Sequence, residues 1–196
     1  MQWDELDFWS SPAWAGIQEK LDGLDKRHIR YNPDRPDMFK ALDLCPFESC
    51  KVAIIGQDPY PQRKFATGVA FSIPPTEGNW PSTLVSIMKE YCSDLGTVGH
   101  DHVTSYPLPK NGDLSKWCEQ GVLLWNACPT YQPYQVLGQK ETLNAHYYWD
   151  WNELTEEVIT KLSNRLISLP KMVKPSWPGL NIKQWPRWCR TLMSKN

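Results

Sequence analysis

Apolar residues along this chain occur in short continuous runs separated by longer segments with helical spacing. Residues 51–55 contain four apolar residues, three of them β-branched, which is typical of a buried strand in a parallel sheet. Residues 121–125 form a second such run, and the alternation over residues 69–73 predicts a third short strand. The apolar residues near 165–169 are compatible with a fourth strand.

Three other segments carry apolar residues at the spacing of an amphipathic helix. The first follows Ser11 and Pro12, a pair that predicts a capped helix start, and we expect its apolar face to pack against the sheet. A short helix before the 121–125 run is expected to end at Gly121, because glycine is favoured just after a helix. The stripes are Trp14, Ile17, Leu21 and Leu24; Leu84, Ile87 and Met88; and Trp151, Leu154, Val158 and Ile159.

Strands that alternate with helices predict an α/β fold. We expect a three-layer α/β/α domain in which a short, twisted, parallel central sheet is flanked by helices. A chain of 196 residues fits one domain with a core of its own, so residues 1–196 are expected to form a single unit.

The loop after residues 51–55 holds the first candidate functional residues. In an open α/β sheet, ligands bind just beyond the carboxyl ends of the strands. Gly56 ends the apolar run, and Asp58 and Tyr60 follow it on a loop that Pro59 and Pro61 stiffen. A carboxylate in this position is a candidate general base.

Composition narrows the function classes. The net charge of −1 does not indicate a wholly basic surface, although a local basic face is enough for DNA binding. No apolar run has transmembrane length and the first residues are acidic, so we expect no membrane association and a cytoplasmic protein, or a nuclear one in a eukaryotic or viral host. Neither GxGxxG nor GxxxxGK[ST] occurs, which argues against a nucleotide binder of the Rossmann or P-loop type.

Metal ligation is not expected. The six cysteines are scattered without a CxxC pair, so we interpret them as structural or incidental thiols in a reducing compartment. His100 and His102 form an HxH pair, but no third ligand lies near them, and an exposed loop is the simpler interpretation. We therefore predict neither a metal nor a cofactor.

Four segments together resemble one family. Residues 56–60, Gly-Gln-Asp-Pro-Tyr, resemble the GQDPYH loop of family-1 uracil-DNA glycosylases, with Pro61 where that family usually has histidine. Residues 66–75 resemble its GLAFSV segment, residues 79–90 its PPSLxNIxKE segment, and residues 112–126 its GDLxxWxxQGVLLLN segment. The resemblance covers roughly residues 30–162, and residues 31–33 resemble the family's segment before its first strand.

The resemblance implies a monomeric enzyme that removes uracil from DNA. Asp58 would activate water, and the backbone amide of Gln57 would meet a uracil carbonyl. Tyr60 would exclude the methyl group of thymine, Phe71 would stack on the extruded base, and Asn126 would bind its polar edge. We therefore expect these side chains to converge on one hollow of nucleobase size.

Plainer interpretations of several residues stay open. Considered alone, Phe71 is more often a core aromatic, and a buried Asn126 more often satisfies backbone groups. By resemblance Pro81 and Ser82 would grip DNA phosphates, and an ordinary helix cap at Ser82 is compatible with that role. Residues 145–159 resemble the family's SHxxxGWxxFTDxVI helix entry, and His146 is expected to be structural because its matched position there is not catalytic.

The resemblance ends near residue 162. The family continues with an apolar strand and a His-Pro-Ser-Pro-Leu-Ser loop, whereas residues 163–196 contain neither and no histidine follows His146. We expect a divergent end, or a truncated or frame-shifted reading frame. The family's histidine donates to the uracil oxygen that gains charge, and losing such a donor costs about 10²–10³ in rate. We expect weak or absent turnover, and the alternative function is a non-catalytic module on the same fold that binds DNA or a replication partner.

Overall fold

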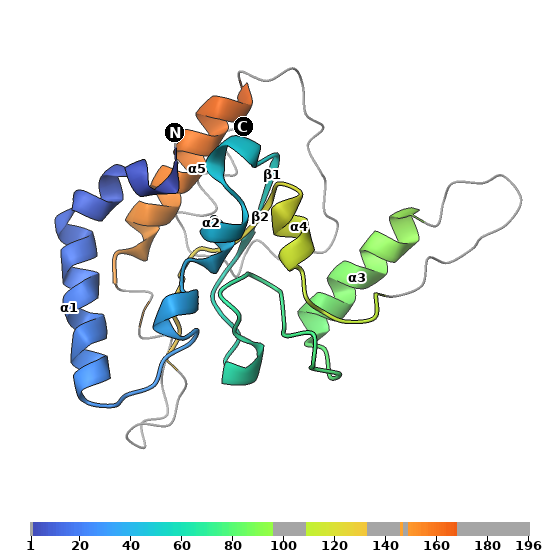
Figure 1. Cartoon of the computed structure of the whole chain (residues 1–196), viewed down its shortest axis with the longest axis horizontal. Helices are drawn as coiled ribbons and strands as arrows, with labels where there is room; N and C mark the ends of the chain where they lie inside the picture. Colours follow the sequence, from blue (N-terminus) through green and yellow to red (C-terminus); the bar gives the residue numbers. More distant parts are fainter. Residues whose placement is uncertain (1, 96–108, 133–145, 147–148, 168–196) are drawn as a thin grey trace, which may run out of the picture.

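The fold is organised around two parallel strands. A computed structural model describes residues 2–95, 109–132, 146 and 149–167 of the chain (Figure 1). Strand β1 (Val52–Gly56) pairs with β2 (Val122–Asn126) in parallel, from Val52 opposite Val122 to Gly56 opposite Asn126. Both strands were predicted, and each lies one residue further along the chain than expected. Since the pairing is parallel and in register, the two strands end at the same edge.

Helices lie on both sides of these strands. In Figure 1 the strands run between α1 (Pro12–Lys26) and α5 (Trp151–Ile167) on one side, and α4 (Ser115–Glu119) and α3 (Ser82–Leu95) on the other. The short helix α2 (Lys40–Leu44) contacts both β2 and α4. This arrangement agrees with the predicted α/β class. Short 3₁₀ helices cover Trp3–Glu5, Asp7–Ser10, Arg35–Asp37, Phe47–Ser49 and Arg63–Phe65.

The N-terminal helix reaches the sheet through aromatic rings. As predicted, Ser11 caps α1, because its Oγ accepts a hydrogen bond from the Trp14 amide at 3.2 Å. The ring of Trp14 packs on Phe39, at a centroid distance of 5.8 Å, and Phe39 in turn stacks on Trp125 of β2. The apolar stripe of α1 is thus connected to the sheet by a layer of rings.

The predicted strand at residues 69–73 is wrong, because these residues form turns. Phe71 has φ +65°, in the left-handed region, and the Ser72 amide donates back to the Val69 carbonyl at 3.2 Å. A strand at 165–169 is also wrong as far as the structure describes it, since α5 continues to Ile167. Arg165 on that helix donates to the carbonyls of Glu48 and Cys50, which fixes the helix against the start of β1.

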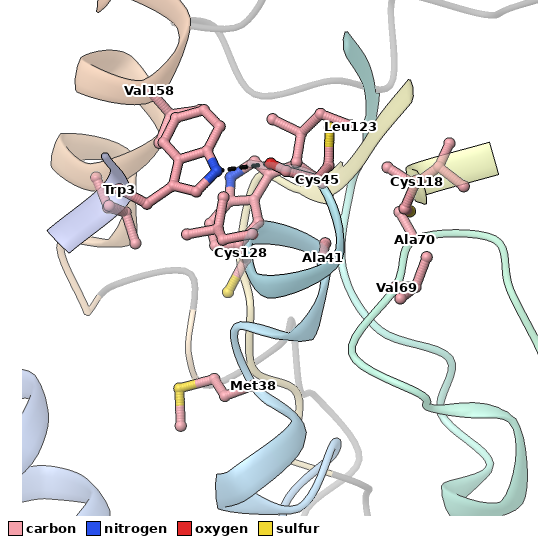
Figure 2. Close-up of a cluster of buried hydrophobic side chains, with 14 of the residues drawn as sticks. Trp3, Met38, Ala41, Cys45, Val69, Ala70, Cys118, Leu123, Cys128 and Val158 are labelled. Atoms are coloured by element: carbon pink, nitrogen blue, oxygen red, sulfur yellow. Dashed lines mark hydrogen bonds between the residues drawn. The ribbon is translucent and has the colours of Figure 1, made fainter. Parts of the chain in front are cut away.

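Buried thiols line the core. The indole nitrogen of Trp3 donates to the Cys45 carbonyl at 2.7 Å, and Figure 2 shows this bond in a buried cluster that also contains Cys118 and Cys128. The five cysteines in the described part of the chain are buried and form no disulfide bond, and Cys189 lies outside it. Among the described residues no group of three His, Cys, Asp or Glu side chains is placed to hold a metal ion. The predicted loop with His100 and His102 lies outside them.

Among the described residues, no helix has the length and apolar character needed to span a membrane.

Replacing Gly121 is expected to destabilise the fold. Gly121 follows α4 with φ +97°, as its predicted role after a helix requires, and a Cβ there would lie 2.3 Å from the Ser49 carbonyl oxygen. We expect Gly121→Ala to lower the free energy of unfolding by about 2 kcal/mol or more, from the left-handed strain and the clash. The urea unfolding midpoint measures this change.

The matched control is Gly16→Ala in the middle of α1. A Cβ at Gly16 has no heavy atom within 4 Å, so alanine is expected to raise stability by about 0.5–1 kcal/mol through its better helix propensity. Equal effects of the two substitutions would contradict the assigned role of Gly121.

Candidate active site

A cavity of about 260 Å³ opens at the carboxyl edge of the two strands. Its wall comes from the loop after β1, the turn around Phe71, the end of β2 and the first turn of α3. All five predicted catalytic and substrate-binding residues line this one cavity, which is large enough for a single nucleobase. The lining residues are Gln57, Asp58, Pro59, Tyr60, Pro61, Phe65, Ala66, Thr67, Val69, Phe71, Thr83 and Asn126.

Asp58 is a partly buried carboxyl group in the wall of the cavity. Burial raises its pKa from 3.8 to about 6, and a side-chain hydrogen bond with Gln57 acts in the opposite direction. Burial raises the pKa of the Cys128 thiol and of Tyr131, which lie on the segment after β2, and the nearby charge of Asp58 raises both further. A carboxylate with a pKa of about 6 is ionised at neutral pH and basic enough to accept a proton.

The side chains of Phe71 and Asn126 both lie next to the α-carbon of Gly56. A Cβ on Gly56 would lie 2.5 Å from Asn126 Oδ1 and 3.3 Å from Phe71 Cζ. Asn126 ends β2 opposite Gly56 and is only 8% exposed. The glycine therefore leaves the space that lets an amide and an aromatic ring share one end of the cavity.

Tyr60 connects the loop after β1 to the turn that carries Phe71. Its hydroxyl donates to the Phe71 carbonyl at 3.2 Å, and its ring packs edge-on against Phe65. Burial raises the pKa of Tyr60 to about 12, so the hydroxyl stays neutral and able to donate. This bond holds Phe71 in its left-handed conformation, which a bulky residue rarely adopts.

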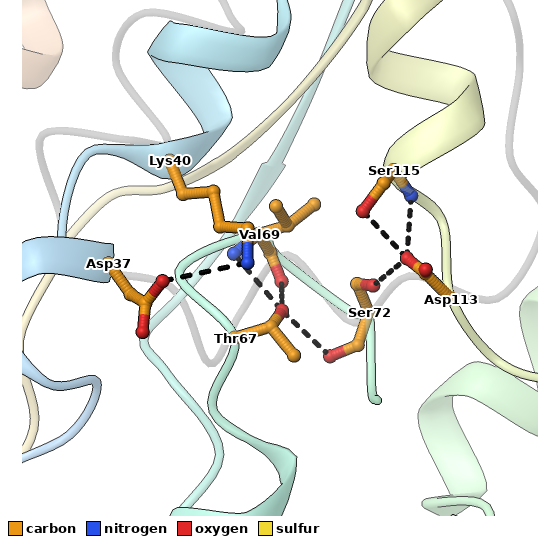
Figure 3. Close-up of polar contacts among 7 residues, drawn as sticks. All are labelled: Asp37, Lys40, Thr67, Val69, Ser72, Asp113 and Ser115. Carbon is orange, nitrogen blue, oxygen red and sulfur yellow. Dashed lines mark hydrogen bonds and ion pairs between the residues drawn. The ribbon is translucent and has the colours of Figure 1, made fainter. Parts of the chain in front are cut away.

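Hydrogen bonds from polar side chains also stabilise the turn that carries Phe71 (Figure 3). Thr67 Oγ1 donates to the Val69 and Ser72 carbonyls, both at 3.4 Å, and accepts from the Val69 amide. The hydroxyl of Ser72 accepts from the Leu114 amide at 3.0 Å. Gly68, with φ +79°, lets the chain pass so close to the Asp37 carbonyl that no side chain fits. The Phe71 ring therefore projects from a turn whose backbone is held by several hydrogen bonds.

The predicted phosphate-gripping residues lie at the rim. Ser82 begins α3 and is exposed, while the Pro81 carbonyl accepts the first helical hydrogen bond, from Val85 at 3.0 Å. Neither residue lines the cavity, but their neighbour Thr83 does. The first N–H groups of an α-helix have no acceptor within the helix, which makes the start of α3 compatible with an anion site beside the cavity.

Basic residues near the cavity are paired with carboxylates. Lys64 contacts Glu77 at 2.7 Å, and Arg63 contacts Asp34. Lys64 is more than half exposed, and such pairs contribute little to stability.

His146 lies in the core and does not line the cavity. Its Nδ1 is 2.7 Å from Thr130 Oγ1, and its ring stacks on Trp149 with centroids 3.7 Å apart. Burial lowers its pKa to about 4, so the imidazole is neutral. A buried, neutral, hydrogen-bonded imidazole is what the predicted structural role requires.

Sequence reasoning missed two residues of the site. Thr83 lines the cavity from α3, and Asn32 binds the loop that carries Asp58 and Tyr60. The position of Ser82 before an amphipathic stripe could have indicated the first. Residues 31–33 resemble a family segment, but that resemblance gives no role to the Asn32 side chain, whose partners are 28 and 29 residues away.

The fold and the site define a class of protein. A carboxylate, an aromatic ring and an amide line one cavity at the carboxyl edge of a parallel sheet, which is where α/β proteins with open sheets bind ligands. The profile of the Uracil DNA glycosylase superfamily matches residues 42–174. The chain belongs to this superfamily.

Individual relatives agree with this assignment. The chain is 37% identical over 140 residues to a uracil-DNA glycosylase of Mycobacterium tuberculosis, and 40% identical over 148 residues to that of Amoebophilus asiaticus. These matches cover 71% and 74% of this chain but 54% and 60% of the relatives, so the chain spans only about half to three fifths of their length. The crystal structure of mimivirus uracil-DNA glycosylase is similar in fold, with a TM-score of 0.64 at 23% identity over 79% of this chain and 52% of that one.

Proposed function

We propose that this chain hydrolyses the N-glycosidic bond of uracil in DNA and so initiates base excision repair. The observation that carries the proposal is the convergence of Asp58, Phe71 and Asn126 on one cavity of nucleobase size. Relatives named uracil-DNA glycosylase at 37–40% identity support it. We further propose that the chain acts as a monomer, without a metal or cofactor, in the cytoplasm or in the nucleus of a eukaryotic or viral host.

Each residue of the cavity has a chemical task in this proposal. The base leaves the DNA stack and enters the cavity, where Phe71 stacks on its face and Asn126 binds its polar edge. Tyr60 limits the space beside the base, so that the methyl group of thymine is refused. As the glycosidic bond breaks, positive charge develops on the sugar, and the Asp58 carboxylate stabilises that charge and accepts a proton from water.

A single-stranded oligonucleotide with one uracil tests the proposal. We expect release of uracil and no release of thymine from a matched oligonucleotide. Binding of DNA without any release of uracil would favour the non-catalytic alternative.

The rate should depend on one ionisation near pH 6. The carboxylate of Asp58 is the active form, and burial raises its pKa to about 6. We therefore expect kcat/KM to fall about tenfold per pH unit below pH 6 and to be constant above it. A pH–rate profile on the single-stranded substrate measures this, and an acid limb near pH 4 would show that Asp58 is not the base or is not buried in solution.

A further inference from the structure

The side chain of Asn32 is almost completely buried next to the loop that carries Asp58. Asn32 lies between α1 and the Arg35–Asp37 turn, is 1% exposed, and donates from Nδ2 to the carbonyls of Tyr60 at 3.0 Å and Pro61 at 2.8 Å. Tyr60 and Pro61 are the last two residues of the loop 57–61, which lines the cavity.

The backbone of Asn32 binds the other loop of the site. Its amide donates to the Tyr131 carbonyl at 2.6 Å, and the Tyr131 amide donates back to the Asn32 carbonyl at 2.8 Å. Tyr131 follows β2, five residues after Asn126, so one residue joins the segments that leave both strands. Just beyond the strands, the Ala127 amide donates to the Gly56 carbonyl and the Cys128 amide donates to the Gln57 carbonyl. Asn32 joins the same two segments further along the chain.

An amide is the side chain that this position requires. Two carbonyl oxygens converge on one nitrogen, and only a group with two N–H donors satisfies both at once. Asn32 Oδ1 is buried without a hydrogen-bond partner among the described residues, so the orientation of the amide is set by the two carbonyls. Aspartate would place an acceptor against two acceptors, and leucine would fill the space without a donor.

We infer that Asn32 is a positioning residue, whose side chain fixes residues 57–61 so that the Asp58 carboxylate stays partly buried beside the base cavity. Asn32 does not line the cavity and acts only through this loop. The kinetic consequence of the inference rests on the proposed glycosylase function, whereas its structural consequence does not.

Asn32→Leu is the test variant. Released from Asn32, the loop is expected to move into water, so that the pKa of Asp58 falls from about 6 by about one unit or more towards its ordinary value. NMR titration of the labelled Asp58 carboxyl group measures this shift without any need for turnover. On uracil-containing single strands, we expect kcat to fall about 10–100-fold with a smaller change in KM, and the acid limb of the rate profile to move with the pKa.

Trp3→Phe is the matched control, because it removes a buried hydrogen bond to the Cys45 carbonyl, away from the cavity. It is expected to lower stability while leaving the Asp58 titration unchanged. An unchanged titration in Asn32→Leu, or an equal shift in both variants, would overturn the inference. Should wild type release no uracil, the proposed function fails, and the titration still decides the role of Asn32.

A measurement on the wild-type chain covers the case in which Asn32→Leu does not fold. The two protons on Asn32 Nδ2 are hydrogen-bonded in a buried site, whereas the side chain of Asn79 is exposed. We therefore expect the Asn32 protons to exchange with solvent about 10²-fold or more slowly than those of Asn79. Equal exchange rates would show that the side chain does not hold the loop in solution.

Discussion

Replacing Asp58 by asparagine is expected to reduce uracil excision by about 10²–10⁴-fold, the usual contribution of a positioned base. Asparagine has nearly the same shape, so the cavity is retained, but it can neither accept the proton from water nor stabilise positive charge on the sugar. Single-turnover release of uracil measures the loss. Binding of a uracil-containing single strand, followed by fluorescence anisotropy, should change little.

The same substitution is expected to stabilise the protein at alkaline pH. The folded-state pKa of Asp58, about 6, lies above the ordinary value of 3.8, so the folded chain holds this proton more tightly than the unfolded chain. The stabilising contribution of that proton is complete below pH 3.8 and is lost as the pH rises through 6. At pH 8 wild type therefore carries a partly buried charge that Asp58→Asn removes.

Urea unfolding at two pH values checks this prediction. We expect Asp58→Asn to be more stable than wild type at about pH 8 and equally stable at about pH 4, where both side chains are neutral. Asp43→Asn, at an exposed position in α2, is the control for the loss of a carboxylate away from the cavity and should leave uracil excision unchanged. Full excision activity in Asp58→Asn, or a stability gain at acid pH alone, would contradict the assigned role.

Gly56→Ala is expected to damage base recognition more than the fold. The added Cβ would lie 2.5 Å from Asn126 Oδ1, so the amide must turn away, and at 3.3 Å it would also press on the Phe71 ring. A displacement of about 1 Å in a binding group costs about 10² in rate, and we expect a loss of this order in kcat/KM. Steady-state excision from the single-stranded substrate measures it.

Gly78→Ala is the matched control for this substitution. A Cβ on Gly78 meets no heavy atom within 4 Å, so alanine there should leave excision unchanged. Unchanged excision in Gly56→Ala as well would show that Asn126 and Phe71 do not converge above this glycine in solution.

Features with a local cause were predictable from the chain itself. The apolar runs before Gly56 and Asn126 predicted both strands, the Ser11–Pro12 pair predicted the start of α1, and Gly121 predicted the end of α4. Each of these depends on the intrinsic preferences of a few neighbouring residues. The predicted roles of the site residues stay predictions, although their side chains line one cavity.

The turn at residues 69–73 could not be predicted in this way. Its alternating pattern favours a strand, but the hydrogen bond from Tyr60 to the Phe71 carbonyl and the bonds of Thr67 hold the chain in a turn. The apolar residues near 165–169 were likewise compatible with a strand. Arg165, however, donates to the carbonyls of Glu48 and Cys50 before β1, and α5 continues to Ile167. In both places contacts from other parts of the chain outweigh local propensity.

By itself the sequence determined which chemical groups are present and that Asp58 and Asn126 lie at or just after the ends of two strands. It also determined that an aspartate, a phenylalanine and an asparagine belong to one family pattern. Only the tertiary structure decided that Asp58 is buried enough to have a pKa of about 6, that Phe71 projects from a left-handed turn, and that Asn32 joins the two loops. The physical reason is that burial and hydrogen bonding between distant segments exist only after the chain has folded.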